Sequence, residues 1–219
     1  MKDEDPNSVN EKELMEYYGY KGTFGNFSMK MKFLRSWILH SLSYSCPHSG
    51  TIAKLQRSRG VKIGKNCHFS AYVQLDLIYP HLVSIGDNVT FGSNVMVFAH
   101  TNPAANLFLK NGEFPRKVEQ VDIKSGAVLF PGSIVTAGVT IGENSIISVG
   151  SVVTHDIPDY SVVVGETEST FSFNFKVENI KILPGTYEVV VSQKLLSRFT
   201  SKNHDLTYYI ALEPDSTFG

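Results

Sequence analysis

The chain has 219 residues, and its 20 basic and 21 acidic side chains nearly cancel. This balance gives no electrostatic footprint for nucleic acid or for an anionic membrane, and a hydrophobic content of 42% excludes global disorder. The two cysteines, Cys46 and Cys67, are too few for a disulfide framework or a cysteine-based zinc site, and they favour a reducing compartment.

Residues 1–60 are expected to form an N-terminal tail and a capping helix. The acidic and polar start of the chain does not resemble a signal peptide. The apolar stretch 33–42 is interrupted by Arg35 and His40, and it is too short to span a bilayer. We therefore expect a cytoplasmic protein without stable membrane insertion.

Residues 31–44 carry apolar side chains at the spacing of a helix. These are Phe33, Leu34, Trp37, Ile38 and Leu42. The favoured interpretation is a helix packed on the open end of a repeat domain. The basic residues Lys30, Lys32 and Arg35 leave a membrane-surface role as the alternative.

A six-residue repeat runs through residues 61–165. An aliphatic or aromatic residue opens each unit, in three runs: Ile63, Phe69 and Leu75; Ile85, Phe91 and Val97; and Ile123, Leu129, Val135, Ile141, Ile147 and Val153. A period of six fits neither an amphipathic helix nor a simple alternating strand. It predicts a solenoid in which three short strands make one triangular coil and the opening residues stack inside. The strands of a β-sandwich, which are the alternative, do not keep one phase over so many units.

Two interruptions break the phase of the repeat. Ile85 stands 10 positions after Leu75, and Ile123 stands 26 positions after Val97. The longer interruption is polar and contains Asn, Gly and Pro, so residues 101–120 are predicted to be a loop ejected from one coil. Loops on a rigid scaffold often carry binding residues.

The hexads stop after Gly165. Residues 166–219 contain three segments with strand-like alternation, FSFNFKV, TYEVVVS and LTYYIAL, and a turn signal, LPGT. The sequence therefore predicts a mainly β protein: a parallel β-helix with an N-terminal helical segment and a C-terminal antiparallel β extension.

The segment IGENSIISVGSVVTHDIPDYSVVVG, residues 141–165, resembles the last coils of hexapeptide-repeat O-acetyltransferases of the maltose and galactoside acetyltransferase type. VKIGKN and VSIGDNVTFGSNVMVFAH match the earlier coils, so the resemblance covers about residues 30–165. It implies a left-handed parallel β-helix and a homotrimer with active sites between subunits. It also implies acetyl-CoA as the acyl donor, no metal, and a sugar or similar small acceptor. Nucleic acid is not an expected partner.

The resemblance assigns His100, which closes the coil before the ejected loop, as the general base that deprotonates the acceptor hydroxyl. Imidazole suits this step because its ordinary pKa lies near neutrality. Asp76 aligns with a family carboxylate in the acceptor pocket, and Asn102 is assigned to the same pocket. By spacing alone, a buried structural histidine and a solvated turn carboxylate remain open as alternatives.

Coenzyme A in this family is held by the late coils, where Val149, Thr154 and His155 occupy the matching positions. Ordinary lining of the solenoid is the alternative for all three residues. The family often has a lysine where His155 stands, which implies a weaker phosphate contact in this chain.

Three further departures from the family pattern are visible. Pro131 stands where the family offers a backbone N–H to the thioester oxygen, and proline has no N–H; losing such a donor costs about 10²–10³ in rate. Phe69 stands where an asparagine is common. In place of the usual basic ending, residues 166–219 resemble the C-terminal end of a sliding clamp of T4-type phages, through TFSFNF, LPGTY and IALEPDST.

Three functions are compatible with these residues. The leading hypothesis is a coenzyme-A-dependent O-acyltransferase that uses His100. The alternative is a solenoid scaffold whose catalysis is impaired by Pro131 and the foreign ending. A γ-class carbonic anhydrase, with zinc on His68, His81 and His100, is a minor alternative because these histidines lack the close pair of that class.

Overall fold

The protein is described by a computed structural model that covers residues 5–164, 181–182 and 189–190. The chain divides into two compact units, residues 1–174 and 175–219. In the second unit, strands β16 (Lys181–Ile182) and β17 (Val189–Val190) pair antiparallel. The latter lies in one of the three predicted C-terminal strands; the other two lie outside the described residues.

Three helices precede the solenoid in the first unit: α1 (Pro6–Tyr18), α2 (Gly22–Tyr44) and α3 (Ser49–Arg59). The carboxylate of Asp5 accepts the N–H groups that α1 leaves unpaired at its start, and the His48 side chain does the same for α3. Left-handed glycines, Gly19 and Gly60, end the same two helices. α2 contains the predicted helix 31–44 and begins earlier, whereas α3 had no counterpart among the predicted elements.

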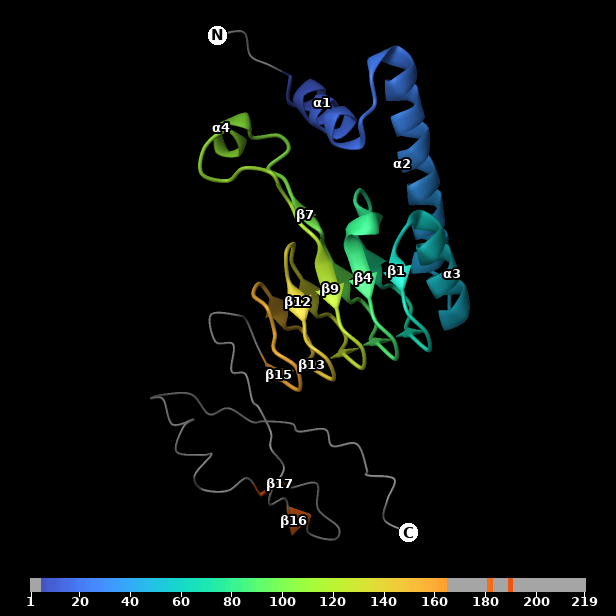
Figure 1. The fold of residues 1–219 in the computed structure, drawn as a ribbon, viewed down its shortest axis with the longest axis vertical. Coiled ribbons are helices and arrows are strands. Elements are labelled where there is room, and N and C mark those ends of the chain that lie inside the picture. The colour runs from blue at the N-terminus through green and yellow to red at the C-terminus, as the bar shows by residue number, and fades with distance from the viewer. Residues whose placement is uncertain (1–4, 165–180, 183–188, 191–219) are drawn as a thin grey trace. The chain divides into compact units, whose positions relative to one another are not determined.

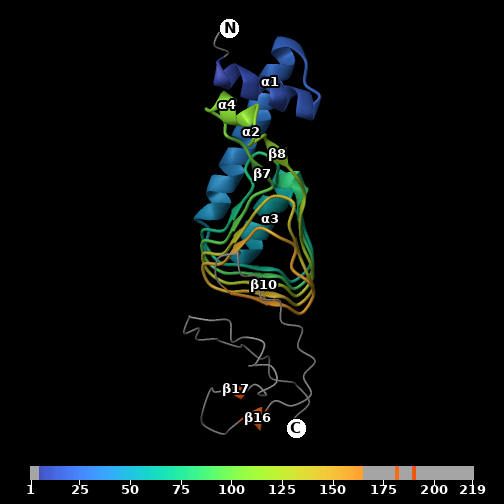
Figure 2. The same ribbon diagram turned by 90° about the vertical axis from the view of Figure 1, so that its left-hand side faces the viewer.

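Short parallel strands then wind into a coil whose outline is triangular (Figure 2). The first two coils contain β1 (Lys62–Ile63), β2 (His68–Phe69), β3 (Gln74–Leu75), β4 (Val83–Ile85), β5 (Thr90–Phe91) and β6 (Met96–Val97). The next coils contain β9 (Val121–Ile123), β10 (Val128–Leu129), β11 (Ile134–Val135), β12 (Thr140–Ile141), β13 (Ile146–Ile147), β14 (Val152–Val153) and β15 (Val162–Val163). They form three sheets, with orders β1-β4-β9-β12, β2-β5-β10-β13-β15 and β3-β6-β11-β14. The predicted parallel β-helix is confirmed.

The residues that open each hexad form the core of the coil. All of them except the first, Ile63, are almost completely buried. Phe69 stacks on Phe91 of the next coil, with ring centroids 4.7 Å apart and planes 6° from parallel. Burying each such side chain contributes about 1.5–3 kcal/mol, so the stacked column holds the coils in register.

The corners of the coil use two different backbone devices. The left-handed residue stands three places after the opening residue, at Asn66, Tyr72, Asn88, Asn94, Gly126, Gly132, Gly138, Asn144, Gly150 and Tyr160. The glycine directly after an opening residue has another purpose. A Cβ added to Gly86 would lie 2.6 Å from the backbone nitrogen of Ser125, so this glycine allows the next coil to approach.

The two interruptions of the repeat lie at the same corner of neighbouring coils. The shorter one contains a 3₁₀ turn, Pro80–Leu82. At the longer one the chain leaves the coil through β7 (His100–Thr101), forms the short helix α4 (Leu107–Lys110) and returns through β8 (Lys117–Val118). β7 and β8 pair antiparallel, so the base of this loop is a two-stranded ribbon (Figure 1).

The N-terminal helices cover the end of the solenoid that begins with β1 (Figure 1). α3 packs on β1, β2 and the 3₁₀ turn, and α2 packs on α3. Among the described residues, no helix is both long enough and apolar enough to cross a bilayer.

Candidate active site

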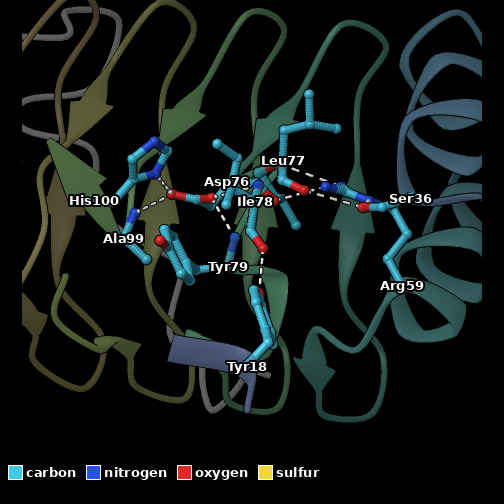
Figure 3. A network of polar contacts seen from close by, with 10 residues as sticks. Tyr18, Ser36, Arg59, Asp76, Leu77, Ile78, Tyr79, Ala99 and His100 are labelled. Carbon is cyan, nitrogen blue, oxygen red and sulfur yellow. Dashed lines mark hydrogen bonds and ion pairs between the residues drawn. The ribbon is translucent and has the colours of Figure 1, made fainter. Parts of the chain in front are cut away.

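His100 lies at the base of the ejected loop, and Asp76 lies at the same corner one coil earlier. The Nδ1 atom of His100 is 2.6 Å from Oδ2 of Asp76 (Figure 3). The His100 side chain is 21% exposed, whereas the Asp76 side chain is fully buried. The repeat brings the two residues together because Leu75 pairs with Val97 across adjacent coils.

The carboxylate of Asp76 is surrounded by donors. Its Oδ1 accepts the backbone N–H groups of Ile78 and Tyr79 at 2.9 and 2.7 Å. Its Oδ2 accepts the Ala99 N–H at 2.8 Å in addition to the contact with His100. A buried carboxylate needs such partners to remain charged. All of these donors belong to the chain itself, so the Asp76 carboxylate is occupied by backbone N–H groups and by the His100 imidazole.

Side chains from all three N-terminal helices hold the backbone next to Asp76. Nη2 of Arg59 donates to the Asp76 carbonyl at 2.6 Å. Ser36 Oγ donates to the Leu77 carbonyl at 3.0 Å, and the Tyr18 hydroxyl donates to the Ile78 carbonyl at 2.5 Å (Figure 3). Burial lowers the pKa of Arg59 to about 10, an effect that the nearby Asp76 partly opposes. We call α1, α2 and α3 together the helical cap. Through these contacts the helical cap supports the Asp76–His100 pair.

The helix α1 also fastens the ejected loop. Nζ of Lys110 lies 2.6 Å from Oε2 of Glu13, and Nη1 of Arg116 lies 3.4 Å from the same oxygen. Asn10 on α1 accepts a hydrogen bond from Nδ2 of Asn102 at 3.1 Å. These contacts join residues about one hundred positions apart in the sequence, and they fix the loop above His100.

Polar atoms without partners lie close to His100. Within the described part of the chain, the Tyr79 hydroxyl, Asn102 Oδ1 and Arg116 Nη2 are buried and have no hydrogen-bond partner. The Tyr79 ring packs edge-on against the His100 ring at 5.1 Å, and the Arg116 guanidinium lies 5.3 Å from the Tyr79 ring centroid. Buried polar groups of this kind are normally paired, so these three atoms are exceptions among the described residues.

A hollow of about 950 Å³ lies along the ejected loop. Thr101 and Asn102 line it next to His100, and Arg116 lines it on the returning arm of the loop. Its size suits a small organic ligand. The predicted acceptor residue Asn102 thus borders the hollow, whereas Asp76 is buried behind His100. The predicted acceptor-binding role of Asp76 remains a prediction.

The predicted coenzyme A residues lie on two different edges of the triangular coil. Thr154 and His155 follow β14, at the corner that His100 occupies two coils earlier, and both are exposed. Coils are about 4.8 Å apart, so Thr154 and His155 lie about 10 Å from the level of His100 along the axis of the solenoid. We call this exposed edge the track below His100. Val149 is 69% exposed and lies at the corner between β13 and β14. A single chain does not bring Val149 to the edge that carries His100.

Pro131 lies on the same edge as Val149, one coil earlier. A Cβ added to Gly92 would lie 2.6 Å from both the nitrogen and Cδ of Pro131. The proline ring therefore fills the space that Gly92 leaves. Within one chain it is remote from the His100 edge, and its predicted effect on an oxyanion contact remains a prediction.

Several site residues had no signal in the hexad pattern. Tyr79 and Arg116 fall in the two interruptions, and Arg59 and Asn10 lie on helices that the repeat does not include. Their partners are distant in sequence, so only the folded coil brings them together. Among the described residues, no group of three His, Cys, Asp or Glu side chains is placed to hold a metal ion. The zinc set considered for a carbonic anhydrase is thus not assembled in this part of the chain.

Comparison with known proteins finds similar repeats. Residues 82–97 and 131–155 match the model described as the hexapeptide repeat of succinyl-transferase. Galactoside O-acetyltransferase from Lactococcus lactis is 40% identical over 106 residues, which cover 47% of this chain and 50% of that protein. The corresponding Escherichia coli enzyme is 37% identical over 107 residues, with 48% and 50% covered. The chain thus spans about half the length of these curated relatives.

Solved structures show the same fold. A hexapeptide-repeat containing acetyltransferase from Vibrio cholerae, complexed with acetyl coenzyme A, superimposes with a TM-score of 0.53 at 16% identity, covering 66% of this chain and 87% of that one. A second structure of that protein gives 0.55, covering 67% and 92%. The left-handed form of the β-helix is confirmed. The resemblance of residues 166–219 to a sliding clamp concerns a segment that is mostly outside the described residues, and it stays a prediction.

The solenoid of this chain is thus similar to the hexapeptide repeat and, over part of its length, to galactoside O-acetyltransferases.

Proposed function

We propose that the protein is a coenzyme-A-dependent O-acyltransferase that acts on a hydroxyl of a sugar or a similar small acceptor, with His100 as the general base. The observation that carries the proposal is the Asp76–His100 pair, which directly precedes the loop residues Thr101 and Asn102 that line the hollow. The sequence relatives support it, because the two named above are galactoside O-acetyltransferases.

The pair has the geometry that general base catalysis needs. With the Nδ1 proton donated to Asp76, the lone pair of His100 is on Nε2, which is the nitrogen left to take a proton from an acceptor hydroxyl. The buried carboxylate fixes this tautomer and stabilises the imidazolium that forms, as the acid of a catalytic triad does. Acetyl-CoA supplies the activated acyl group. As the acceptor oxygen bonds to the acyl carbon and the C–S bond breaks, the proton held on Nε2 passes to the departing thiolate.

The surroundings of His100 suit an acceptor rich in hydroxyl groups. Asn102 and Arg116 both line the loop hollow, and amide and guanidinium groups are side chains that can bind hydroxyl groups. We assign Asn102 to acceptor binding for this reason. Thr154 and His155, on the exposed track below His100, and Val149, on the neighbouring edge, are the residues proposed to hold coenzyme A.

The separation of these residues on two edges fits the proposed homotrimer. An edge that carries Val149 in one copy would have to face the His100 edge of the next copy to complete a single groove. A cytoplasmic location belongs to the same proposal, and it follows from the sequence expectation alone.

The test measures turnover of acetyl-CoA with a panel of sugar acceptors. Release of the free thiol is the readout. His100→Ala is expected to lower kcat by about 10²–10⁴, the usual contribution of a general base, without a change in oligomeric mass. His68→Ala, at an exposed position on β2, is the matched control. Equal turnover in the parent and the His100 variant would overturn the assignment.

Binding of coenzyme A separates this function from the impaired scaffold. Calorimetric titration of the parent protein with coenzyme A is expected to give saturable binding that is weakened in a Thr154→Ala, His155→Ala double variant. Absence of binding together with absence of turnover would favour the scaffold.

A further inference from the structure

The outer face of α2 is a long apolar surface. Large hydrophobic side chains are exposed along nearly its whole length: Phe24, Phe27, Met31, Leu34, Trp37, Ile38, Leu42 and Tyr44. Phe24 is 81% exposed, Phe27 62% and Trp37 55%. We call these eight residues the α2 stripe. At 1.5 Å per residue, it extends over about 30 Å.

The opposite face of α2 already has its partners. Met29, Ser36 and Ser43 are buried, and they recur every seven residues, which places them on one side of the helix. Ser36 bonds to the Leu77 carbonyl, and Ser43 accepts from Gln56 on α3. The α2 stripe therefore faces away from the solenoid. Contiguous apolar surface of this extent is unusual on a protein that has no partner for it.

The charged side chains of α2 and α3 are all basic. Between Tyr17 and Leu75 the sequence contains no Asp or Glu. The basic residues in this range are Lys21, Lys30, Lys32, Arg35, Lys54, Arg57, Arg59, Lys62 and Lys65. The whole chain is nearly neutral in spite of this local excess of positive charge. The sequence-based expectation that the charge gives no footprint for an anionic membrane does not hold for α2 and α3.

Two of these cations lie on either side of the centre of the stripe. At 100° per residue, Phe27, Leu34 and Ile38 fall within one narrow sector of the helix. Lys30 lies on one side of that sector and Arg35 on the other. Both are exposed, although Lys30 also pairs with Glu11 on α1. An apolar stripe with aromatic residues and basic flanks is the pattern of a helix that lies in the headgroup region of a bilayer.

A second copy of the chain is a poorer occupant for this face. Pairing two stripes would bring the basic flanks of both copies together, and no acidic residue of α2 or α3 is present to neutralise them. An anionic lipid surface supplies the missing negative charge and accepts the apolar side chains at the same time.

We propose that the α2 stripe docks this protein peripherally on an anionic lipid bilayer. The apolar side chains enter the headgroup and acyl boundary, while Lys30 and Arg35 contact lipid phosphates. The proposal is independent of the acyl transfer proposed above.

The test is co-sedimentation of the full chain with vesicles of phosphatidylcholine, with or without phosphatidylglycerol. We expect binding to the vesicles that contain phosphatidylglycerol, little binding to phosphatidylcholine alone, and a decrease with added NaCl. The triple variant Phe27→Ser, Leu34→Ser, Ile38→Ser is expected to lose binding at least tenfold. Lys30→Gln with Arg35→Gln is expected to weaken it about tenfold or more, since each basic residue near such a surface adds about 1 kcal/mol.

Phe108→Ser is the matched control, because Phe108 is an exposed aromatic on the ejected loop rather than on α2. Circular dichroism checks that all variants are folded, and light scattering gives the mass of each. Unchanged binding of the triple variant, or no binding of the parent to anionic vesicles, would overturn the proposal. A lower oligomeric mass of the triple variant without any vesicle binding by the parent would identify the stripe as a contact between copies instead, and this outcome also overturns it.

Discussion

The carboxylate of Asp76 illustrates how much one buried side chain can organise. It receives two backbone N–H groups from its own turn, one from Ala99 and the Nδ1 contact of His100. The same group therefore closes the turn after β3, joins two coils and sets the orientation of the imidazole. A neutral replacement would disturb all three, but the chemical consequence concerns His100 first.

Replacement of Asp76 by Asn tests this role. The amide keeps the shape, but it cannot accept from every one of the four donors, and it no longer stabilises the imidazolium form of His100. We expect kcat to fall about 10²-fold or more with a smaller change in KM for the acceptor. A purely acceptor-binding Asp76 would instead raise KM and leave kcat near that of the parent.

The corners of the coil explain why glycine recurs at fixed places. Gly86 has an ordinary negative φ, yet a Cβ there would meet the Ser125 backbone at 2.6 Å. Ser148 occupies the same place in its own hexad, directly after Ile147, and has a side chain. The need for glycine thus depends on the coil that follows and not on the hexad position alone.

Gly86→Ala is expected to destabilise the protein by about 1–3 kcal/mol, the usual range for inserting atoms into packed structure. Ser148→Ala, in the same hexad position, should have a small effect. Urea unfolding followed by circular dichroism measures both, and equal midpoints would show that the coils relax around the added methyl group.

The helical cap contains a group whose ionisation opposes folding. His40 on α2 accepts a hydrogen bond from Nη1 of Arg59 on Nδ1, and burial, with a smaller effect of Arg59, lowers the His40 pKa from 6.5 to about 4. The unfolded chain therefore binds this proton more readily than the folded protein. Stability contributed by neutral His40 is complete above pH 6.5 and is lost as the pH falls toward 4.

The corresponding variant is His40→Gln, which has no titrating side chain. We expect the melting temperature of the parent to fall between pH 7 and pH 5 more steeply than that of the variant. His68→Gln, at an exposed site, is the control for removal of a histidine. Parallel slopes for the parent and the His40 variant would contradict the role assigned to burial.

The sequence and the structure agree best where the information is local and repeated. Each hexad places one buried residue, and the residue that it meets stands at the same position of the next coil, so Leu129 and Ile147 could be matched without coordinates. The place of His100 at the rim of a loop followed from the second break in phase. The fold class was therefore accessible from the pattern alone, whereas the role of His100 came from the family resemblance.

Other parts depended on contacts that no repeat records. α3 has a weakly hydrophobic sequence, and it is held by burial of Ile52 and Ala53 in the core and by hydrogen bonds from Gln56 and Arg59 to α2. Glu13 and Lys110 meet only because the ejected loop folds back over α1. The role of Asp76 was hard to predict from the sequence for the same reason. Its partners come from two coils, and its orientation depends on helices that precede the repeat.

At the scale of the whole molecule, the solenoid is a one-dimensional stack in which every coil is stabilised only by its neighbours. One end is covered by α2 and α3, while strand β15 is the last described strand at the other. No described helix packs on that second end, so we expect opening by local fluctuation to start there. Asp76 and His100 lie in the first two coils, far from the end that opens. Thr154 and His155 lie beside the coil that opens first.

Amide hydrogen exchange should therefore be slow for β2, β5 and β10 and faster for β13 and β14. Saturating coenzyme A is expected to slow exchange selectively in β13 and β14, because a ligand that binds only the closed form suppresses opening. In such a stack, affinity for the acyl donor and the tendency of the terminal coil to fray are two measures of one equilibrium. A substitution far from any ligand that loosens β15 would then weaken coenzyme A binding while leaving the Asp76–His100 pair intact.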